Sequence, residues 1–520
     1  LYGLRSMKIT FVHLGREHLG IEYLSSLLKQ AGHRTALAYD PGLFGPEDNV
    51  FHIRFLEKLF NLRQQIISQV LESSPDLIAL TVYSGTYAWA GRIAAEIRQI
   101  EDTPTVFGGI HATLAPRSII ENDFADFVVE GEGFEALPEL AGALENNGSV
   151  EDIANLWFKK DGRVNHNPPR PPFSDFDSLP LPDKALFEKD VNFRDDYVIL
   201  TSLGCVFNCS YCCESYLNRL YRNRYFRRRE VEAVMKELVI MKNRYGFKEV
   251  MFNDALFFTD KRWLKQLLAR YVKEIGVPFR CFGKINNLDE EVCRLLKESG
   301  CYCIEFGLQT LNETIRKTVL HRNETNQQAR AAFRLCDSYR LRYDIDHMFG
   351  LPGETEQDHI EGALFYSRLR RLNRVKCHNL TYFPNLPIIE SARRKNILDQ
   401  ADLDDIDKGR ITNFFHDAFI KDRQLRRARD TFSRFFKLLP LIPAPLVRWL
   451  TARRRYELFR FIPSPLVIAG QLLAAVKGRD YRYVIYFKYY PLRIKRVIKR
   501  KWLTSGRTAP GDGPGRRAGR

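Results

Sequence analysis

The chain has 520 residues, of which 45% are hydrophobic and 28% charged. These fractions are ordinary for a soluble globular protein and exclude a disordered polyelectrolyte. The net charge is +17, but residues 421–520 hold 26 of the 80 Lys and Arg residues and only 5 of the 63 Asp and Glu residues. The rest of the chain is therefore close to neutral, which argues against a catalytic core that binds nucleic acid.

The first 150 residues alternate short apolar runs with helical patterns. The expected strands are KITFVH, TALAYD, DLIALTVY, TPTVFGG and ADFVVEG, with amphipathic stretches between them. Strands that alternate with helices predict a parallel sheet with helices on both faces. We therefore expect a doubly wound, Rossmann-like domain over residues 7–145.

The rest of the chain is divided by composition. Residues 146–195 are rich in Pro and Asp and are predicted to be a linker. From residue 196 to 400 about six apolar runs alternate with helices, which predicts a full or partial β/α barrel. Residues 401–502 are expected to be a helical, basic region, and the low-complexity residues 503–520 a disordered tail.

Cysteines are sparse, and three of them are clustered. Ten cysteines in 520 residues are too few for a disulfide scaffold, and no run of 18 apolar residues or secretory signal is found, so we expect a cytoplasmic protein with reduced thiols. Cys205, Cys209 and Cys212 follow a predicted strand directly. Three thiolates on one loop suit an iron–sulfur cluster with one open iron. Cys213 is the rival fourth ligand, and a zinc site or three buried thiols are the alternatives.

The triplet C-x-x-x-C-x-x-C after a strand resembles the signature of the radical S-adenosylmethionine (SAM) superfamily. Further along the chain, FNDALF at 252–257, CIEFGLQ at 303–309 and GLPGET at 350–355 resemble later segments of that family, in the family's order. The resemblance implies a [4Fe–4S] cluster on the three cysteines. It also implies that SAM binds the open iron and is cleaved to a 5′-deoxyadenosyl radical, which the barrel interior would shield from water.

The resemblance also implies a set of SAM contacts. Phe207 and Tyr211 would shield the cluster, and Glu305 and Gln309 would lie on one strand face with Gly307 between them. Asp254 has a helix N-cap as its structural alternative. Arg322 either pairs with a carboxylate or is solvated. The predicted SAM-binding residues are Phe207, Tyr211, Asp254, Glu305, Gly307, Gln309, Gly350, Leu351 and Pro352.

The N-terminal domain resembles the cobalamin-binding domain of B12-dependent radical SAM proteins. The resemblance rests on PDLIALTVYSGTY, VFGGIHATLAP and ADFVVEGEGFEALPEL. Gly108 and Gly109 end a strand where a large flat ligand could approach. The predicted cobalamin-binding residues are Thr81, Ser84, Thr86, Gly108, Gly109, His111, Glu130 and Gly131. The motif D-x-H-x-x-G, whose histidine ligates cobalt in many cobalamin proteins, is absent, so a domain that only covers the substrate is the alternative.

The basic C-terminal region has three interpretations. The stretch FIPSPLVIAGQLLAAV is too short to span a bilayer but is flanked by dense Lys and Arg, which suits an interfacial helix on an anionic membrane. Tyr481, Tyr483, Tyr486 and Tyr490 could instead stack on nucleic-acid bases. A helical cap with a solvated basic face is the third interpretation.

Together these features predict a radical SAM enzyme that uses cobalamin to methylate an unactivated carbon. A radical cyclase or oxidoreductase like the anaerobic magnesium-protoporphyrin ester cyclase is the first alternative, and an RNA-modifying or RNA-binding protein the second. The expected partners are a small-molecule or lipid-like substrate, an electron donor such as flavodoxin or ferredoxin, and an anionic membrane surface. The catalytic residue that quenches the radical is not predicted.

Overall fold

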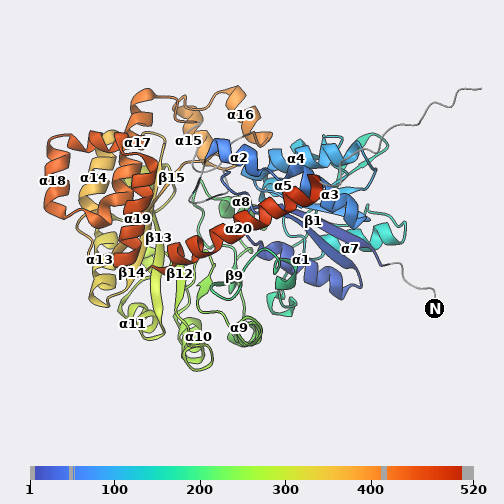
Figure 1. Cartoon of the computed structure of the whole chain (residues 1–520), viewed down its shortest axis with the longest axis horizontal. Coiled ribbons are helices and arrows are strands. Elements are labelled where there is room, and N and C mark those ends of the chain that lie inside the picture. Colours follow the sequence, from blue (N-terminus) through green and yellow to red (C-terminus); the bar gives the residue numbers. More distant parts are fainter. Residues whose placement is uncertain are drawn as a thin grey trace, which may run out of the picture.

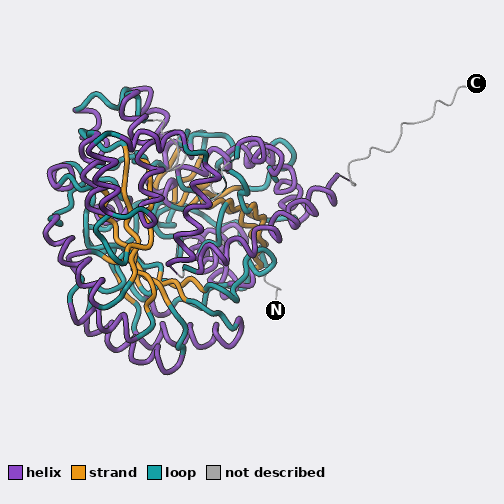
Figure 2. Tube along the Cα trace, turned by 60° about the vertical axis from the view of Figure 1, so that its left-hand side comes forward, coloured by secondary structure: helices purple, strands orange, loops and turns teal. Residues whose placement is uncertain are grey.

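The computed structural model describes residues 6–45, 48, 51, 53–410, 419–478 and 480–505. It contains a mainly parallel sheet and a parallel sheet, each flanked by helices (Figure 1). The strands lie inside the molecule and the helices around them (Figure 2). This is the predicted α/β architecture with a helical C-terminal region.

The N-terminal sheet has the strand order β2-β1-β3-β4-β5-β6-β7, and its first five strands are parallel. These strands are β1 (Lys8–Leu14), β2 (Arg34–Asp40), β3 (Leu77–Thr81), β4 (Thr105–Gly108) and β5 (Phe127–Val129). The helices that cover them are α1 (Leu19–Gln30), α2 (Arg54–Phe60), α3 (Arg63–Ser73), α4 (Ser84–Arg98), α5 (Ile110–Leu114), α6 (Pro116–Ile120) and α7 (Ala136–Glu145). The strands are apolar runs because both faces of a parallel sheet are covered. The strand order reverses between β1 and β3, with β2 on one side and β4 on the other, and ligands bind outside the carboxyl ends of the strands at such a switch point.

The sheet continues into the segment predicted to be a linker. Two antiparallel strands, β6 (Leu156–Lys160) and β7 (Arg163–His166), extend it beyond β5. Asp161-Gly162 forms the turn between them, and both residues have positive φ, as a two-residue hairpin requires. The prediction that residues 146–195 form a linker is therefore wrong for residues 156–166, which form this hairpin. The Pro-rich residues 167–196 that follow fit the prediction of a linker. They contain two single-turn helices, η1 (Phe176–Ser178) and η2 (Lys184–Leu186), and no strand.

The second sheet has six parallel strands in the order β15-β14-β13-β12-β11-β8, so the described strands form a partial barrel. They are β8 (Tyr197–Ile199), β11 (Val250–Phe252), β12 (Phe279–Gly283), β13 (Cys301–Gln309), β14 (Arg342–Phe349) and β15 (Leu372–Asn379). The helices are α8 (Cys213–Leu220), α9 (Val231–Tyr245), α10 (Lys261–Glu274), α11 (Glu290–Glu298), α12 (Glu313–Thr318), α13 (Asn326–Ser338) and α14 (Glu356–Tyr366). A short turn η3 (Ile285–Asn287) follows β12, and β9 (Ser202–Leu203) pairs with β10 (Arg227–Arg228) beside the sheet.

The C-terminal region is helical as predicted. It comprises α15 (Ile388–Arg394), α16 (Gln400–Asp407), α17 (Arg423–Leu438), η4 (Leu439–Leu441), α18 (Ala444–Ala452), η5 (Arg455–Phe461), α19 (Ser464–Gly478) and α20 (Tyr481–Ser505). Helix α17 buries Phe432, Phe435 and Phe436 in the same core as the barrel strands. The C-terminal region is therefore part of the barrel's hydrophobic core and not a detached tail.

Helix α20 crosses from the barrel to the N-terminal domain (Figure 1, red). At its start, Arg482 Nη1 lies 2.8 Å from Asp344 Oδ2 on β14. In its first half, the Tyr490 hydroxyl donates to Asp48 at 2.5 Å. Near its end, Arg500 Nη1 donates to the Tyr39 carbonyl on β2 at 2.9 Å, and Arg500 Nη2 lies 2.7 Å from Asp190. Part of the C-terminal positive charge therefore holds the two domains together.

These contacts bear on the nucleic-acid interpretation. The hydroxyls of Tyr486 and Tyr490 both donate to Asp48, and Tyr490 is buried. The Tyr490 ring is therefore not open for stacking on a base, and the half-buried Tyr486 ring packs against Phe51, Phe487 and Tyr490. The side chains of Tyr481 and Tyr483 lie outside the described part of the chain.

Two further findings concern the C-terminal end. Helix α20 runs to Ser505, so the predicted disordered tail does not begin at residue 503, and residues 506–520 lie outside the described part of the chain. Among the described helices, none is by itself long and apolar enough to cross a membrane. The pair η5 and α19 meets those criteria only when taken together, and it is bent by 109°.

Candidate functional site

The three clustered cysteines lie on one loop between β9 and α8. Asn218 on α8 fixes this loop by donating to the Cys205 carbonyl at 2.8 Å and to the Asn208 side chain at 2.9 Å. The Cys212 amide donates to the Cys209 carbonyl at 3.1 Å, which closes a tight turn. All three cysteines are free thiols, as a cluster site requires.

Burial makes the bare thiolates unfavourable. It raises the pKa of Cys205 to about 12 and the pKa of Cys209 as well. Cationic iron reverses that preference, because a coordinated thiol is deprotonated. Three buried or half-buried cysteines on one fixed loop therefore fit a metal cluster better than three isolated thiols.

Cys213, the rival ligand, is the first residue of α8. It packs with Tyr211 and Tyr216 against an apolar cluster that contains Leu351 and Tyr382. These neighbours are consistent with its interpretation as a packing residue.

Arg322 connects the cluster loop to β13. It is 8% exposed, and its guanidinium lies 3.9 Å from Cys209 Sγ, 3.2 Å from the Tyr211 hydroxyl and 2.6 Å from Glu324. It also donates to the Gly307 carbonyl at 2.5 Å. Of the two interpretations of Arg322, the structure supports the pairing with a carboxylate, and the solvated interpretation is wrong.

A second cation beside the loop was not predicted. Lys284, after β12, lies 3.1 Å above the Phe207 ring centroid and 3.5 Å from Glu324. Glu324, two residues after Arg322, is also buried and unpredicted. The only feature of the sequence that could have indicated this ion pair is that Glu324 stands two residues after Arg322. Positive side chains next to the cysteines would offset the negative charge of a thiolate cluster.

A cavity of about 280 Å³ opens beside the cluster loop. Its lining combines apolar side chains with Glu214 and Asp254, each of which has one buried carboxylate oxygen without a hydrogen-bond partner. Asp254 is fully buried, and its other oxygen accepts from the Thr201 amide, the Thr201 hydroxyl and the Ser202 hydroxyl at 2.6–2.9 Å. It caps no helix, so the N-cap alternative is wrong. The two free oxygens suit a ligand with hydrogen-bond donors, such as the ammonium group of SAM.

Glu305, Gly307 and Gln309 do not follow the simple alternation predicted for them. The pairing of β13 with β14 shifts between Gly307 and Gln309, and Gln309 has φ of 70°. Its side chain lies against Gly307, where an added Cβ would be 2.6 Å from Gln309 Nε2. Gln309 Oε1 is buried without a partner. Glu305 instead pairs with Lys376 on β15 at 2.5 Å.

The segment 350–353 forms the predicted turn after β14. Gly350 and Gly353 have positive φ, and the Gly350 and Leu351 amides both donate to one Glu354 oxygen at 2.8 and 3.3 Å. Leu351 is buried, and Pro352 stands between Leu351 and Gly353 in this turn. Glu354 therefore fixes the turn, and the backbone of the turn lies at the carboxyl end of the sheet, where β/α sites form.

Two glycines at the end of β4 have different roles. Gly109 has φ of +95°, and a Cβ there would be 2.7 Å from the Val82 carbonyl, so the fold itself requires this glycine. Gly108 has nothing within 4 Å of an added Cβ. The space above Gly108 is therefore open, as the prediction of a flat ligand at this strand end requires.

Two of the hydroxyl side chains predicted to bind cobalamin, Ser84 and Thr86, already form hydrogen bonds within the protein. Ser84 Oγ lies 2.9 Å from His111 Nδ1, and Thr86 forms a capping box with Tyr83 at the start of α4. His111 is fully buried and its Nε2 has no partner. Burial lowers its pKa to about 4, so the ring is neutral.

The turn at Glu130 and Gly131 joins the two domains. Gly131 has φ of +82°, and a Cβ there would overlap the Tyr221 hydroxyl at the end of α8. The Glu132 amide donates to that hydroxyl at 2.8 Å, and the Glu132 carboxylate pairs with Arg227. Glu130 accepts from Trp157 Nε1 at 2.8 Å within its own domain. The carboxyl end of the first sheet therefore faces the helix that follows the cysteine loop.

Comparisons with known proteins agree with this geometry. Residues 16–141 match the family model "B12 binding domain", and residues 199–365 match "Radical SAM superfamily". An uncharacterized methyltransferase of Pyrococcus horikoshii is 28% identical over 374 residues, which are 71% of this chain and 80% of that protein. The anaerobic magnesium-protoporphyrin IX monomethyl ester cyclase of Cereibacter sphaeroides is 23% identical over 382 residues, 68% of this chain and 58% of the cyclase.

Solved structures show the same fold. The cobalamin-dependent SAM radical enzyme OxsB, with aqua-cobalamin and SAM bound, has a TM-score of 0.64 and 16% identity, covering 96% of this chain and 84% of OxsB. The radical SAM methyltransferase TsrM from Kitasatospora setae, with cobalamin and a [4Fe–4S] cluster, has a TM-score of 0.60 and 19% identity, covering 75% and 78%. With the matched domains, these findings confirm the predicted family: the chain has an N-terminal B12 binding domain followed by a domain of the radical SAM superfamily, and the cofactors of these two families are cobalamin, a [4Fe–4S] cluster and SAM.

Proposed function

We propose that the protein transfers a methyl group to an unactivated carbon of a small molecule. The observation that carries this proposal is the contact between Gly131 and Tyr221, which brings the carboxyl end of the B12 domain's sheet to α8, the helix that follows the cysteine loop. Cobalamin and SAM, when bound, supply the transferable methyl group and the hydrogen-abstracting radical. A substrate carbon between the two edges would lose a hydrogen atom to the radical and accept the methyl group in its place.

The chain's own residues would prepare the site. Cys205, Cys209 and Cys212 would hold the cluster, and Arg322 would fix Cys209 through its contact with the sulfur. Asp254 and Glu214 would orient a ligand in the cavity through their free oxygens. The close packing of α5 and α8 at the interface would exclude water from the reacting groups.

The test is anaerobic incubation of the reconstituted protein with hydroxocobalamin, a flavodoxin or ferredoxin as electron donor, and SAM labelled as CD3. Small-molecule extracts provide candidate substrates. We expect a product in which CD3 replaces hydrogen, formed by the wild-type protein and not by Cys209→Ala. Production of 5′-deoxyadenosine with no labelled product would instead favour a cyclase or oxidoreductase, like the magnesium-protoporphyrin relative.

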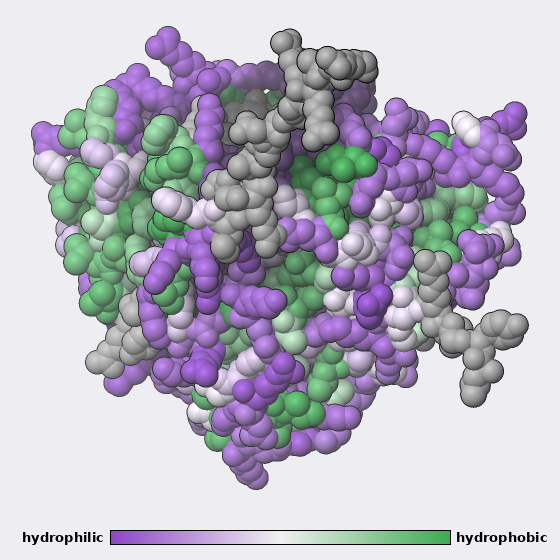
Figure 3. All heavy atoms as spheres, turned by 45° about the vertical axis from the view of Figure 1, so that its right-hand side comes forward, coloured by the Kyte–Doolittle hydropathy of each residue, from purple (hydrophilic) through white to green (hydrophobic). Residues whose placement is uncertain are grey.

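We further propose that the protein contacts an anionic membrane through its C-terminal helices. Large apolar side chains on and around α18, η5 and α19 are exposed, namely Leu446, Trp449, Leu458, Phe461, Leu466, Leu473 and Val476. Figure 3 shows that apolar residues, in green, reach the surface of the molecule on the left-hand side of that view. Arg455 lies 4.0 Å above the Trp449 ring. Apolar side chains beside cations suit the headgroup region, through which a lipid-like substrate would also arrive.

Leu466→Glu combined with Leu473→Glu should weaken binding to anionic vesicles at least tenfold. The two residues lie seven apart on one face of α19 and are 62% and 64% exposed, so the change removes apolar contact and adds repulsion without disturbing the core. Co-sedimentation with phosphatidylserine-containing vesicles measures the binding. Val272→Glu on α10, where the valine is 48% exposed, is the matched control. Unchanged binding by the double variant would contradict the proposal.

A further inference from the structure

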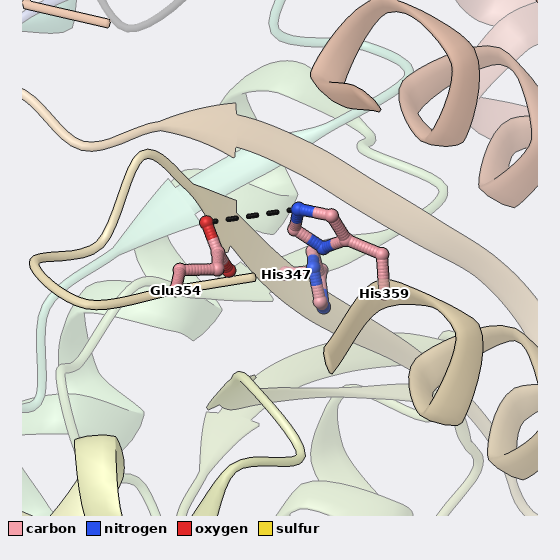
Figure 4. Close-up of side chains that lie close together, drawn as sticks. All are labelled: His347, Glu354 and His359. Atoms are coloured by element: carbon pink, nitrogen blue, oxygen red, sulfur yellow. Dashed lines mark ion pairs between the residues drawn. The ribbon is translucent and has the colours of Figure 1, made fainter. Parts of the chain in front are cut away.

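Three ionisable side chains meet beneath the turn at 350–353. His347 comes from β14, Glu354 follows the turn, and His359 lies on α14 (Figure 4). Their exposed fractions are 0%, 5% and 2%. One nitrogen or oxygen atom from each lies within 4.8 Å of the corresponding atoms of the other two. None of the three belongs to the cysteine loop or the SAM cavity.

Each of these side chains has a buried atom without a hydrogen-bond partner. The atoms are His347 Nε2, Glu354 Oε1 and His359 Nδ1. Buried polar atoms in native proteins are almost always satisfied, so three such atoms in one cluster call for a ligand that the protein holds there.

Two of these side chains are also held by the protein. His347 Nδ1 lies 2.9 Å from the Tyr366 hydroxyl, which leaves Nε2 for an ion. Glu354 Oε2 accepts from the Gly350 and Leu351 amides and also faces His359 Nε2 at 3.7 Å (Figure 4). Metal-binding histidines and carboxylates are fixed in this manner, with the outer atom hydrogen-bonded and the inner lone pair directed at the ion.

We propose that His347, Glu354 and His359 bind one Zn²⁺ ion. Two imidazoles and a carboxylate form a known zinc ligand set, and a water molecule would complete the tetrahedron. The ring centroids of the two histidines are 5.7 Å apart. Two imidazoles bound to one tetrahedral Zn²⁺ at about 2.0–2.1 Å have centroids about 5 Å apart, so only a small contraction is needed.

The surroundings indicate a structural site. The rings of Phe349, Phe432 and Phe436 pack around the histidines, which excludes bulk water. A site this deeply buried would take up its ion as the chain folds. The ion would join β14, the turn and α14, and so would hold the backbone of Gly350 and Leu351 through Glu354. The site is independent of the proposed methyl transfer, so either can fail without the other.

The test uses the full-length protein, produced with zinc and reconstituted with its iron–sulfur cluster. Elemental analysis after desalting should find about one zinc per chain, and zinc X-ray absorption should show only N/O ligands, at about 2.0–2.2 Å. Zinc bound adventitiously by the cysteine loop would show sulfur at about 2.3 Å. A sulfur-ligated ion, or no zinc, would overturn the proposal.

Variants locate the ion. His359→Gln should lose the zinc, whereas His166→Gln, on the exposed hairpin strand β7, should keep it. A Cys205→Ala variant should also keep the zinc although it lacks the cluster. Full zinc in His359→Gln would overturn the assignment, and the absorption spectrum of the wild-type protein decides the question if that variant does not fold.

Discussion

Cys209→Ala should abolish the visible iron–sulfur absorbance of the reconstituted protein and reduce SAM cleavage to background. The same result is expected for Cys205→Ala and Cys212→Ala, because a cluster with only three protein ligands cannot lose one and still leave a single open iron for SAM. Iron and sulfide analysis, together with the yield of 5′-deoxyadenosine, measures the effect.

Cys213→Ala is the matched control. Cys213 follows the last ligand directly but packs against an apolar cluster. The variant should retain iron, absorbance and SAM cleavage close to the wild-type values. Loss of the cluster equal to that in Cys212→Ala would contradict the ligand assignment.

Arg322→Met should destabilise the protein by about 3–5 kcal/mol, the usual cost of removing one partner from a buried ion pair. Methionine has about the length of the arginine side chain but no charge. The Glu324 side chain is fully buried and would keep Lys284, at 3.5 Å, as an ion-pair partner but lose Arg322. It also removes the donors to Tyr211 and to the Gly307 carbonyl. Chemical denaturation of the anaerobically reconstituted protein measures the loss.

The control for this change is an exposed ion pair. Arg270 pairs with Glu274 on the surface of α10, so Arg270→Met should cost less than about 1 kcal/mol. If Arg322→Met cost no more than Arg270→Met, Arg322 would not hold the cluster loop to β13. Arg322→Met should also broaden or shift the cluster absorbance, since the guanidinium is 3.9 Å from Cys209 Sγ.

Local patterns were sufficient to predict the two α/β domains and the cysteine loop. The strands are apolar runs of ordinary length, and the three cysteines are close in sequence, so no long-range information was needed. The hairpin β6–β7 was missed because its Asp161-Gly162 turn lies next to a Pro-rich segment, whose composition dominated the prediction of a linker.

Contacts between distant residues could not be predicted from one sequence. The basic residues of α20 looked like a surface for anionic partners, but Arg482 and Arg500 pair with aspartates more than 100 residues away. Pairing depends on where the fold places the acids, and periodicity contains no information about that. His347 and His359 were missed as a pair because one lies on the strand β14 and the other on the helix α14. Only the fold of the turn between them shows that the two side chains meet.

The central claim is that one chain holds both a radical SAM cluster and cobalamin. Anaerobic purification with cobalamin supplied, followed by measurement of cobalt, iron and the ultraviolet–visible spectrum, tests it most directly. The account predicts about one cobalt for every four irons, with the absorbance of cobalamin and of the cluster in the same protein. Four irons without cobalt would contradict it and would leave the N-terminal domain as a cover for the substrate.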